Sequence, residues 1–321
     1  MHKNLGAAFV VCAILLGATV AAAQGYPVRP ITLIMPYAPG GLTDIVTRAI
    51  SDEVAKDLGQ PLIIDTRAGA GGRIGLGVIK RAAKDGYTIG VAVPATLTLP
   101  LIDPSTEFDP LKDFSYISIA VDTIMILVVN PKLPIQSAGE LAAYGKANRD
   151  KLNYGTPGAA TSFHIYSVLL NDMLGFDATH VPYKGEAQAL SDIVGGSIQY
   201  MLAGAGAQSF ISSGRVRALA TTSVRRAPAL PGTPTLTELG FPLVSQGWVG
   251  YIGPAGIPSD VMQRLSRAFT VALKSPRVEK AIIDMGYLVR ASGPVEFQSS
   301  IATSMDLFGG LIRSGKVKID K

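Results

Sequence analysis

Residues 31–44 read ITLIMPYAPGGLTD and combine an apolar run, a glycine turn and the start of a helix. The apolar run from Ile31 to Met35 is typical of a strand that is buried on both faces of a sheet. Gly40 and Gly41 follow it, and glycine allows other groups to approach the backbone closely. The apolar spacing from Asp44 to Leu58 then predicts a helix. This strand–turn–helix unit indicates an α/β fold.

The same order of elements continues along the first third of the chain. Strands are expected at residues 61–65 and 88–93, with a helix at residues 74–83 between them. Strands that alternate with helices at this spacing indicate a parallel sheet with helices on both faces. The first unit is therefore predicted to form one layered α/β lobe.

A second unit of the same kind begins near Thr123. Ser137 and Glu140 form a capping box at the start of one of its helices. The stretch GTPGAATS at residues 155–162 is a second glycine turn between a strand and a helix. The predicted elements are strands at 124–129, 152–154, 179–183, 198–203 and 218–222, and helices at 161–174 and 187–194. Two similar lobes in one chain indicate a hinged protein with a ligand held between them.

Three prolines, Pro228, Pro231 and Pro234, form a stiff and extended connection back to the first lobe. The elements expected beyond it are a strand at 248–252 and helices at 259–274 (capped by Ser259), 276–285 and 294–314. We assign residues 1–23 to a signal peptide, residues 24–123 and 229–321 to lobe 1, and residues 124–228 to lobe 2.

The first residues of the chain have the pattern of a secretory signal. A weakly positive start at Lys3 is followed by an apolar run at residues 5–20, and three alanines end at Ala23, where cleavage is expected. A membrane anchor is the alternative, but the run is short for a span of roughly 20 residues and no charged stop follows it. The only cysteine, Cys12, lies within this segment, so we expect an exported periplasmic protein without disulfides or cysteine-bound metal.

Composition argues against a nucleic-acid-binding role. The net charge is +5 for the whole chain, and the excess of positive charge is spread thinly, without a block of like charges. Aromatic residues make up only 7% of the chain. Nucleic-acid binding favours a concentrated basic face. The mild positive balance suits a small anionic ligand without requiring one.

The two glycine turns are the candidate binding elements. The first N–H groups of a helix are unpaired and carry partial positive charge, so the turns at Gly40–Asp44 and Gly158–Ser162 can each receive a carboxylate. Both follow the carboxyl ends of predicted strands, where open α/β sheets bind ligands. The alternative is that Thr43, Asp44 and Ser162 only cap their helices.

Several catalytic, cofactor and metal motifs are incomplete. The glycine-rich stretch at residues 69–75 has Ile74 where a dinucleotide fingerprint needs glycine, and we place Gly71 only at the rim of the cleft. The P-loop spacing at residues 310–316 is followed by Val317 instead of serine or threonine. His164 and His180 lack an acidic cluster, and His164 has the context of a packing residue. We therefore expect no catalytic residue, cofactor or metal.

The combined pattern resembles the Bug family, the solute-binding proteins of tripartite tricarboxylate transporters, from about Tyr26 to Lys321. No single segment is specific, but their order is. The segments are YPVRPI at 26–31, PYAPGGLTD at 36–44, GAGG at 69–72, DGYT at 85–88, KLNYGTPG at 151–158, HVPYKG at 180–185, RALA at 217–220, PGTPT at 231–235 and PAGIP at 254–258.

The resemblance implies a type II periplasmic-binding-protein fold, in which two lobes are joined by crossover strands, placed here near residues 124–129 and 218–222. It also implies a carboxylate ligand held between the two glycine turns, partly through water. The matching positions are Tyr37, Gly41, Leu42, Thr43 and Asp44 in the first lobe and Gly158, Ala159, Thr161, Ser162, Tyr183 and Lys184 in the second.

Departures from the family pattern bear on the choice of ligand. Leu42 replaces a small polar residue, Thr161 with the preceding alanine replaces a Gly-Ser pair, and Gln199 stands where an aspartate is common. Losing that acid removes a partner for an amino group, which favours a dicarboxylate or an aromatic carboxylate over an amino acid. The alternative is that Gln199 does not meet the ligand.

The expected role is that of a monomeric receptor without enzymatic activity, which captures a small carboxylate for transporter subunits in the membrane. A sensory protein that reports to a sensor kinase ectodomain is the second hypothesis. A periplasmic hydrolase that uses Ser162 or His164 is the third and least favoured hypothesis. Asp44, Asp65, Asp85 and His164 could form a triad, but nothing in their spacing requires one.

Overall fold

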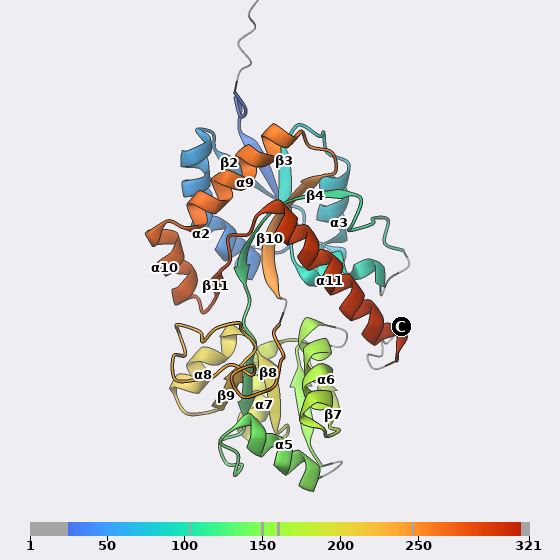
Figure 1. Cartoon of the computed structure of the whole chain (residues 1–321), viewed down its shortest axis with the longest axis vertical. Coiled ribbons are helices and arrows are strands. Elements are labelled where there is room, and N and C mark those ends of the chain that lie inside the picture. The colour runs from blue at the N-terminus through green and yellow to red at the C-terminus, as the bar shows by residue number, and fades with distance from the viewer. Residues whose placement is uncertain are drawn as a thin grey trace, which may run out of the picture.

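The structure is a computed structural model that describes residues 25–101, 103, 105–148, 151–158, 161–245 and 247–315. The proposed signal segment, Cys12 and Ala159 lie outside the described residues. Two lobes lie along the long axis of the molecule, each built around one sheet, with a narrow connection between them (Figure 1).

The first lobe contains a six-stranded sheet in the order β11-β4-β10-β3-β1-β2. Its strands are β1 (Ile31–Met35), β2 (Leu62–Thr66), β3 (Thr88–Ala92), β4 (Phe114–Asp122), β10 (Trp248–Pro254) and β11 (Leu288–Val289). β1 pairs in parallel with β2 and β3, as predicted, whereas β10 is antiparallel to both β3 and β4. The three strands on which the prediction rests are therefore parallel, and the antiparallel pairing of β4, β10 and β11 makes the sheet as a whole mixed. β4 leads out towards the second lobe and β10 returns from it, so the two neighbours run in opposite directions.

Helices cover both faces of this sheet, as expected. The helices of the lobe are α2 (Leu42–Leu58), α3 (Arg73–Lys80), α4 (Pro94–Leu97), α9 (Ser259–Leu273), α10 (Pro276–Asp284) and α11 (Pro294–Arg313), with 3₁₀ turns η2 (Ala70–Gly72) and η3 (Leu99–Leu101). Val46 and Ile50 of α2 pack with Leu265 and Phe269 of α9 in one buried cluster. A second cluster contains Leu76 and Ile79 of α3 and Phe297 and Ile301 of α11.

The second lobe contains a five-stranded sheet in the order β7-β6-β8-β5-β9. Its strands are β5 (Ile126–Val129), β6 (Asn153–Thr156), β7 (Thr179–Pro182), β8 (Tyr200–Ala203) and β9 (Arg217–Thr221), and its helices are α5 (Ala138–Ala147), α6 (Ser162–Leu174), α7 (Glu186–Gly195), α8 (Gln208–Ser212) and the 3₁₀ turn η4 (Ala205–Ala207). β6 is parallel to β7 and β8, and β5 is antiparallel to β8 and β9. This sheet is thus also mixed.

Two chain segments connect the lobes, at residues 123–125 and 222–247. They are hydrogen-bonded to each other, from Thr123 N to Gly247 O at 2.8 Å and from Thr222 N to Met125 O at 2.9 Å. The predicted crossover strands fall largely within the second sheet as β5 and β9, and the chain crosses beside them. The residue boundaries of the two lobes stay a prediction.

Two helix starts test the capping predictions. Ser137 caps α5, and its Oγ accepts a bond from Glu140 N at 3.1 Å. The Glu140 carboxylate accepts from Gln136 N at 2.7 Å, one residue before the expected partner. The predicted cap at Ser259 is wrong, because the cap position of α9 is Pro258 and Ser259 is already helical.

Helix α11 contacts both lobes. Near its start, the fully buried Phe297 lies 4.8 Å from the Trp248 ring of the first lobe, measured between ring centroids. Near its end, Phe308 packs edge-on against Tyr166 of α6 in the second lobe, at 6.3 Å. The helix therefore forms a third link between the lobes, which Figure 1 shows running diagonally towards α6.

Candidate ligand site between the lobes

A cavity of about 530 Å³ lies where loops of the first lobe meet the start of α6 and the end of α11. The first-lobe walls follow the carboxyl ends of the strands β1, β2 and β3. This is the position at which open α/β sheets bind ligands, and the volume is in the usual range for a small-molecule site. It is lined by Pro36, Tyr37, Ala38, Ala68, Gly69, Gly71, Gly72, Val93, Ala95, Thr96, Thr98, Leu99, Leu101, Thr161, Ile165, Phe308 and Ile312.

Asp44 holds the first glycine turn in shape. Its buried carboxylate accepts hydrogen bonds from Gly40 N and from Arg48 Nε, both at 2.9 Å. The Arg48 guanidinium and the Gly40 N–H hold the pKa of Asp44 below its usual range. The cap position of α2 is Gly41, which offers no side-chain cap to the first-turn N–H groups. Asp44 thus shapes the turn, while the backbone of the turn carries the positive end of the helix dipole.

The loop after β2 packs tightly beneath the cavity. Four successive residues, from Gly69 to Gly72, have positive φ, including Ala70 at 47°. A Cβ on Gly72 would lie 2.8 Å from Thr96 Cγ2 and 3.4 Å from the Tyr37 ring. Only glycine at position 72 therefore allows this loop to lie against both side chains.

Tyr37 and Thr96 form a hydrogen-bonded hydroxyl pair in the wall of the cavity. Burial raises the pKa of the Tyr37 phenol well above its ordinary value. A phenol is protonated at neutral pH even with an ordinary pKa of about 10, so the pair acts as a neutral polar group.

The second lobe contributes the start of α6. Its cap residue is Thr161, not Ser162: the Thr161 Oγ1 accepts from His164 N at 3.3 Å and donates to Gly158 O at 2.8 Å. Gly158 has a φ of 134°, which favours glycine. Thr156 Oγ1 also donates to Gly158 O, at 2.9 Å. Two hydroxyls therefore fix the carbonyl of this turn.

The structure brings only some of the predicted residues to the cavity. Tyr37, Gly71 and Thr161 line it. Gly41, Leu42, Thr43 and Asp44 belong to the first turn and Gly158 and Ser162 to the second, and none of these six is part of the cavity wall.

Three other predicted residues have different partners or lie outside the wall. The Tyr183 hydroxyl donates to Asp192 on α7 at 2.7 Å. Lys184 is exposed and does not line the cavity. Gln199 accepts from Asn153 N at 2.7 Å, at the amino ends of β6 and β8 and thus at the opposite end of β6 from Gly158.

Sequence reasoning missed most of the apolar wall. The loop after β3 contains Val93, Thr96 and Leu99 and follows the third parallel strand. The rule that ligands bind at the carboxyl ends of such strands applies to this loop as it does to the first two. Phe308 and Ile312 had no comparable signal, because only the path of α11 brings them to the cavity.

The two described histidines, which come from α6 and β7, are in contact. The rings of His164 and His180 stack at 3.8 Å with an interplanar angle of 13°, and Tyr154 stacks on His180 at 5.1 Å. His180 Nε2 is 2.7 Å from Thr156 Oγ1, so the stacked rings are hydrogen-bonded to the last residue of β6, just before the second turn. Among the described residues, no group of three histidine, cysteine or acidic side chains is placed to hold a metal ion.

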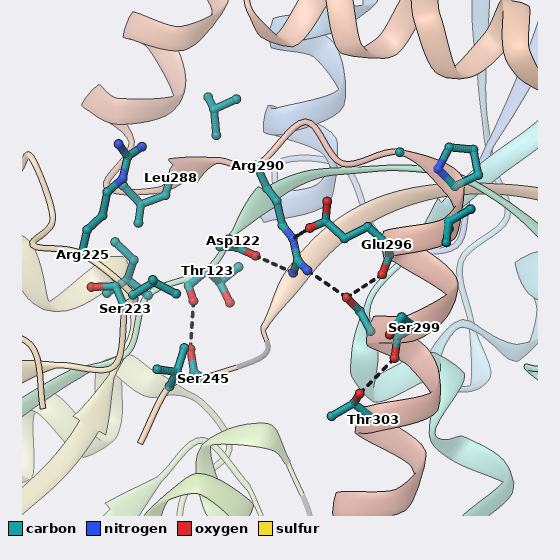
Figure 2. A pocket seen from close by; sticks show the side chains of 18 residues that line it. Asp122, Thr123, Ser223, Arg225, Ser245, Leu288, Arg290, Glu296, Ser299 and Thr303 are labelled. Atoms are coloured by element: carbon teal, nitrogen blue, oxygen red, sulfur yellow. Dashed lines mark hydrogen bonds and ion pairs between the residues drawn. The ribbon is translucent and has the colours of Figure 1, made fainter. Parts of the chain in front are cut away.

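A larger groove of about 930 Å³ lies beside the hinge segments (Figure 2). Arg290 lies at its centre and bonds to Asp122 at 3.2 Å, to Glu296 at 2.8 Å and to Ser300 at 2.8 Å. Burial raises the pKa of Asp122, and the neighbouring Arg290 opposes this effect. Because these charges compensate one another and the groove lacks the loops after β1, β2 and β3, we assign the ligand site to the smaller cavity.

A two-lobed α/β chain with a cavity between its lobes and two hydrogen-bonded hinge segments is a solute-binding protein of the hinged class. The chain belongs to the family described as the tripartite tricarboxylate transporter family receptor, TctC, which it matches over residues 46–314. This is a family of receptors and not of enzymes. Within the part of the chain that the structure describes, no helix is both long and apolar enough to cross a membrane.

Two relatives illustrate the similarity in sequence. The UPF0065 protein in the gbd 5' region of Cupriavidus necator is 34% identical over 279 residues, which cover 86% of this chain and 85% of that protein. Protein BugT of Bordetella pertussis is 32% identical over 302 residues, which cover 92% of each chain.

Solved structures agree with the fold. MatC from Rhodopseudomonas palustris with bound malate has a TM-score of 0.68 and 31% identity, covering 88% of this chain and 100% of that chain. Rpa4515 from R. palustris with adipate has a TM-score of 0.73 and 27% identity, covering 91% and 99%. The periplasmic binding protein BugD has a TM-score of 0.70 and 30% identity, covering 91% and 99%. The predicted Bug-type, two-lobed fold is confirmed.

Proposed function

We propose that this chain captures a small carboxylate in the periplasm and delivers it to membrane subunits of a tripartite tricarboxylate transporter. The observation that carries the proposal is the cavity between the lobes, to which Tyr37 contributes from one lobe and Thr161 from the other. A ligand that contacts both lobes stabilises the arrangement in which they meet, and a membrane partner can recognise that arrangement.

The carboxylate group is proposed to lie at the edge of the cavity, against backbone N–H groups of the two turns that adjoin the wall residues Ala38 and Thr161. Gly41, Leu42 and Thr43 begin α2, and Gly158 and Ser162 flank the start of α6. Both helices exceed eight residues, and their first N–H groups attract negative charge. Gly71 extends this polar backbone surface from the loop after β2. Asp44 shapes the turn in this proposal and does not contact the ligand.

The neighbours that hold malate and adipate support a carboxylate as the ligand. For this chain the direct test is calorimetry of the purified protein against mono-, di- and tricarboxylates. We expect saturable binding of at least one of them, together with a raised melting temperature. Failure of the whole panel would overturn the proposal.

A matched pair of variants locates the site. Ala95 is exposed and lines the cavity, so Ala95→Trp fills the cavity without disturbing the core. Ala143 is an exposed alanine on α5 outside the cavity wall, and Ala143→Trp is the control. We expect Ala95→Trp to abolish binding and Ala143→Trp to preserve it. Equal affinities for the two variants would place the ligand elsewhere.

Export and partnership are tested separately. Cleavage after Ala23 gives a mature protein that begins at Gln24, which mass spectrometry of the periplasmic fraction measures directly. Crosslinking in ligand-containing membranes is expected to capture transporter subunits. Capture of a sensor kinase in their place would favour the sensory role.

A further inference from the structure

We infer that the ligand is a monocarboxylate with an apolar body, and not a di- or tricarboxylate. This inference rests on the proposed function, because it assumes that one carboxylate group lies against the two turns and that the rest of the ligand enters the cavity. It concerns what the rest of the cavity accepts.

The first observation is the absence of charge from the described wall of the cavity. None of its described residues is aspartate, glutamate, lysine, arginine or histidine. The wall is formed largely by aliphatic and aromatic side chains from three sources: Leu99 and Leu101 of η3, Ile165 of α6, and Phe308 and Ile312 of α11. Such a surface favours the apolar part of a ligand.

The second observation is that the hydroxyls in the wall have few protons to donate. Thr98 Oγ1 donates to Pro94 O at 2.9 Å, and Thr161 Oγ1 donates to Gly158 O at 2.8 Å. Tyr37 and Thr96 share one hydrogen bond, which leaves one of their two protons for a ligand. A second carboxylate, which accepts several hydrogen bonds, would therefore find one hydroxyl donor among these side chains.

The cations next to the wall in sequence do not supply the missing donors. Arg67, next to Ala68, pairs with Asp65 at 3.0 Å. Arg73 pairs with Asp103 and Ser105 and lines a different cavity. Arg313, next to Ile312, is exposed and its guanidinium lies over Gly309, outside the cavity wall. Closure of the lobes around the ligand would bury such a group, and an ionised group buried without a partner is strongly disfavoured. A second carboxylate in the ligand is consequently expected to weaken binding.

The experiment compares acids that differ only in the second carboxylate. The pairs are hexanoate with adipate and benzoate with terephthalate, each titrated by calorimetry into the wild-type protein. We expect the monoacid of the better-bound pair to bind about 100-fold more tightly than its diacid. Arg313→Ala should leave this ratio unchanged.

A variant that introduces a positive charge into the cavity tests the cause. Leu99 is half-buried, so Leu99→Arg can place a guanidinium in the cavity with limited damage to the core, and Leu99→Met is its apolar control. We expect Leu99→Arg to shift the ratio at least tenfold towards the diacid and Leu99→Met to leave it in place. Thermal melts confirm that both variants are folded.

The outcomes separate the two proposals. A wild-type protein that binds adipate or terephthalate as tightly as the matching monoacid would overturn this inference and leave the proposed function standing. A wild-type protein that binds none of the four acids, nor any other carboxylate, would overturn the proposed function and this inference with it.

Discussion

At the scale of single residues, Asp44 shows how a side chain shapes a candidate site without lining it. Its carboxylate ties the N–H of Gly40 to the first turn of α2, and it pairs with the exposed Arg48 at 2.9 Å. A bond between a carboxylate and a backbone N–H is of the stronger kind, whereas a pair with an exposed arginine contributes little.

Asp44→Ala is therefore expected to lower the free energy of unfolding by about 1–2 kcal/mol. Arg48→Ala should lower it by a clearly smaller amount, because an ion pair with an exposed arginine contributes little to stability. Because the folded pKa of Asp44 is depressed, its contribution is present above its unfolded pKa and is lost as the pH falls through the folded value. Urea titrations at pH 7 and pH 3 measure both effects. Equal losses in the two variants would show that the ion pair, and not the bond to Gly40, holds the turn.

Glu186 gives the opposite dependence on pH. Burial raises its pKa, which the bond from Gly204 N at 2.5 Å only partly opposes, and Tyr287 of the first lobe lies close enough to sense its charge. The ionised form is thus disfavoured in the folded state, and the destabilisation appears as the pH rises through the unfolded pKa. Glu186→Gln keeps an acceptor for Gly204 N, so its melting temperature should exceed that of the wild type at pH 7 and equal it at pH 4. Identical differences at both pH values would contradict this explanation.

At the scale of elements, local patterns located most helices and strands, but β4 was missed. It is the longest strand in the described part of the chain, with nine residues, and it reads FSYISIAVD. Serines 115 and 118 interrupt its apolar pattern, and Ser118 is nevertheless fully buried in the sheet. Pairing with both β10 and β11 fixes this segment as a strand, and neither partner is close to it in sequence.

The loop between β2 and α3 provides a prediction at this scale. Gly72 and Gly59 both have positive φ, but a Cβ on Gly72 would crowd Thr96, whereas a Cβ on Gly59 would meet nothing within 4 Å. Gly59→Ala should lower the free energy of unfolding by about 1 kcal/mol through backbone strain alone and leave ligand affinity unchanged. Gly72→Ala should destabilise the protein more and weaken binding about tenfold, because Thr96 and Tyr37 must move. Calorimetry and urea titration measure the two quantities, and unchanged affinity in Gly72→Ala would separate this loop from the site.

At the scale of the whole molecule, α11 connects the lobes through contacts separate from those of the hinge segments. Its first half is buried in lobe 1 through Phe297, and its second half contacts α6 and the cavity through Phe308. Any change in the angle between the lobes must be accommodated at the contact between Phe308 and Tyr166. The helix therefore couples the arrangement of the lobes to the shape of the cavity.

Two phenylalanine truncations on the same helix test this coupling. Phe297→Ala and Phe308→Ala should each lower the free energy of unfolding by about 3–5 kcal/mol, since both side chains are buried. Only Phe308→Ala should also weaken ligand binding by about tenfold or more, because only Phe308 lines the cavity. Ligand affinity is measured by calorimetry at a temperature at which both variants are folded. An equal loss of affinity in the two variants would indicate a general effect of lower stability and not a role of Phe308 in the cavity.

The sequence by itself determined the two α/β lobes, the strand–turn–helix units at residues 31–44 and 155–162, and the cap at Ser137, because apolar periodicity, glycine turns and helix caps are local properties of the chain. The tertiary structure decided the antiparallel half of the first sheet, the path of α11 to the second lobe, and the neutral, apolar wall that Leu99, Ile165 and Phe308 form together. These features depend on contacts between residues separated by up to a few hundred positions, and such contacts leave no pattern in any short stretch of sequence.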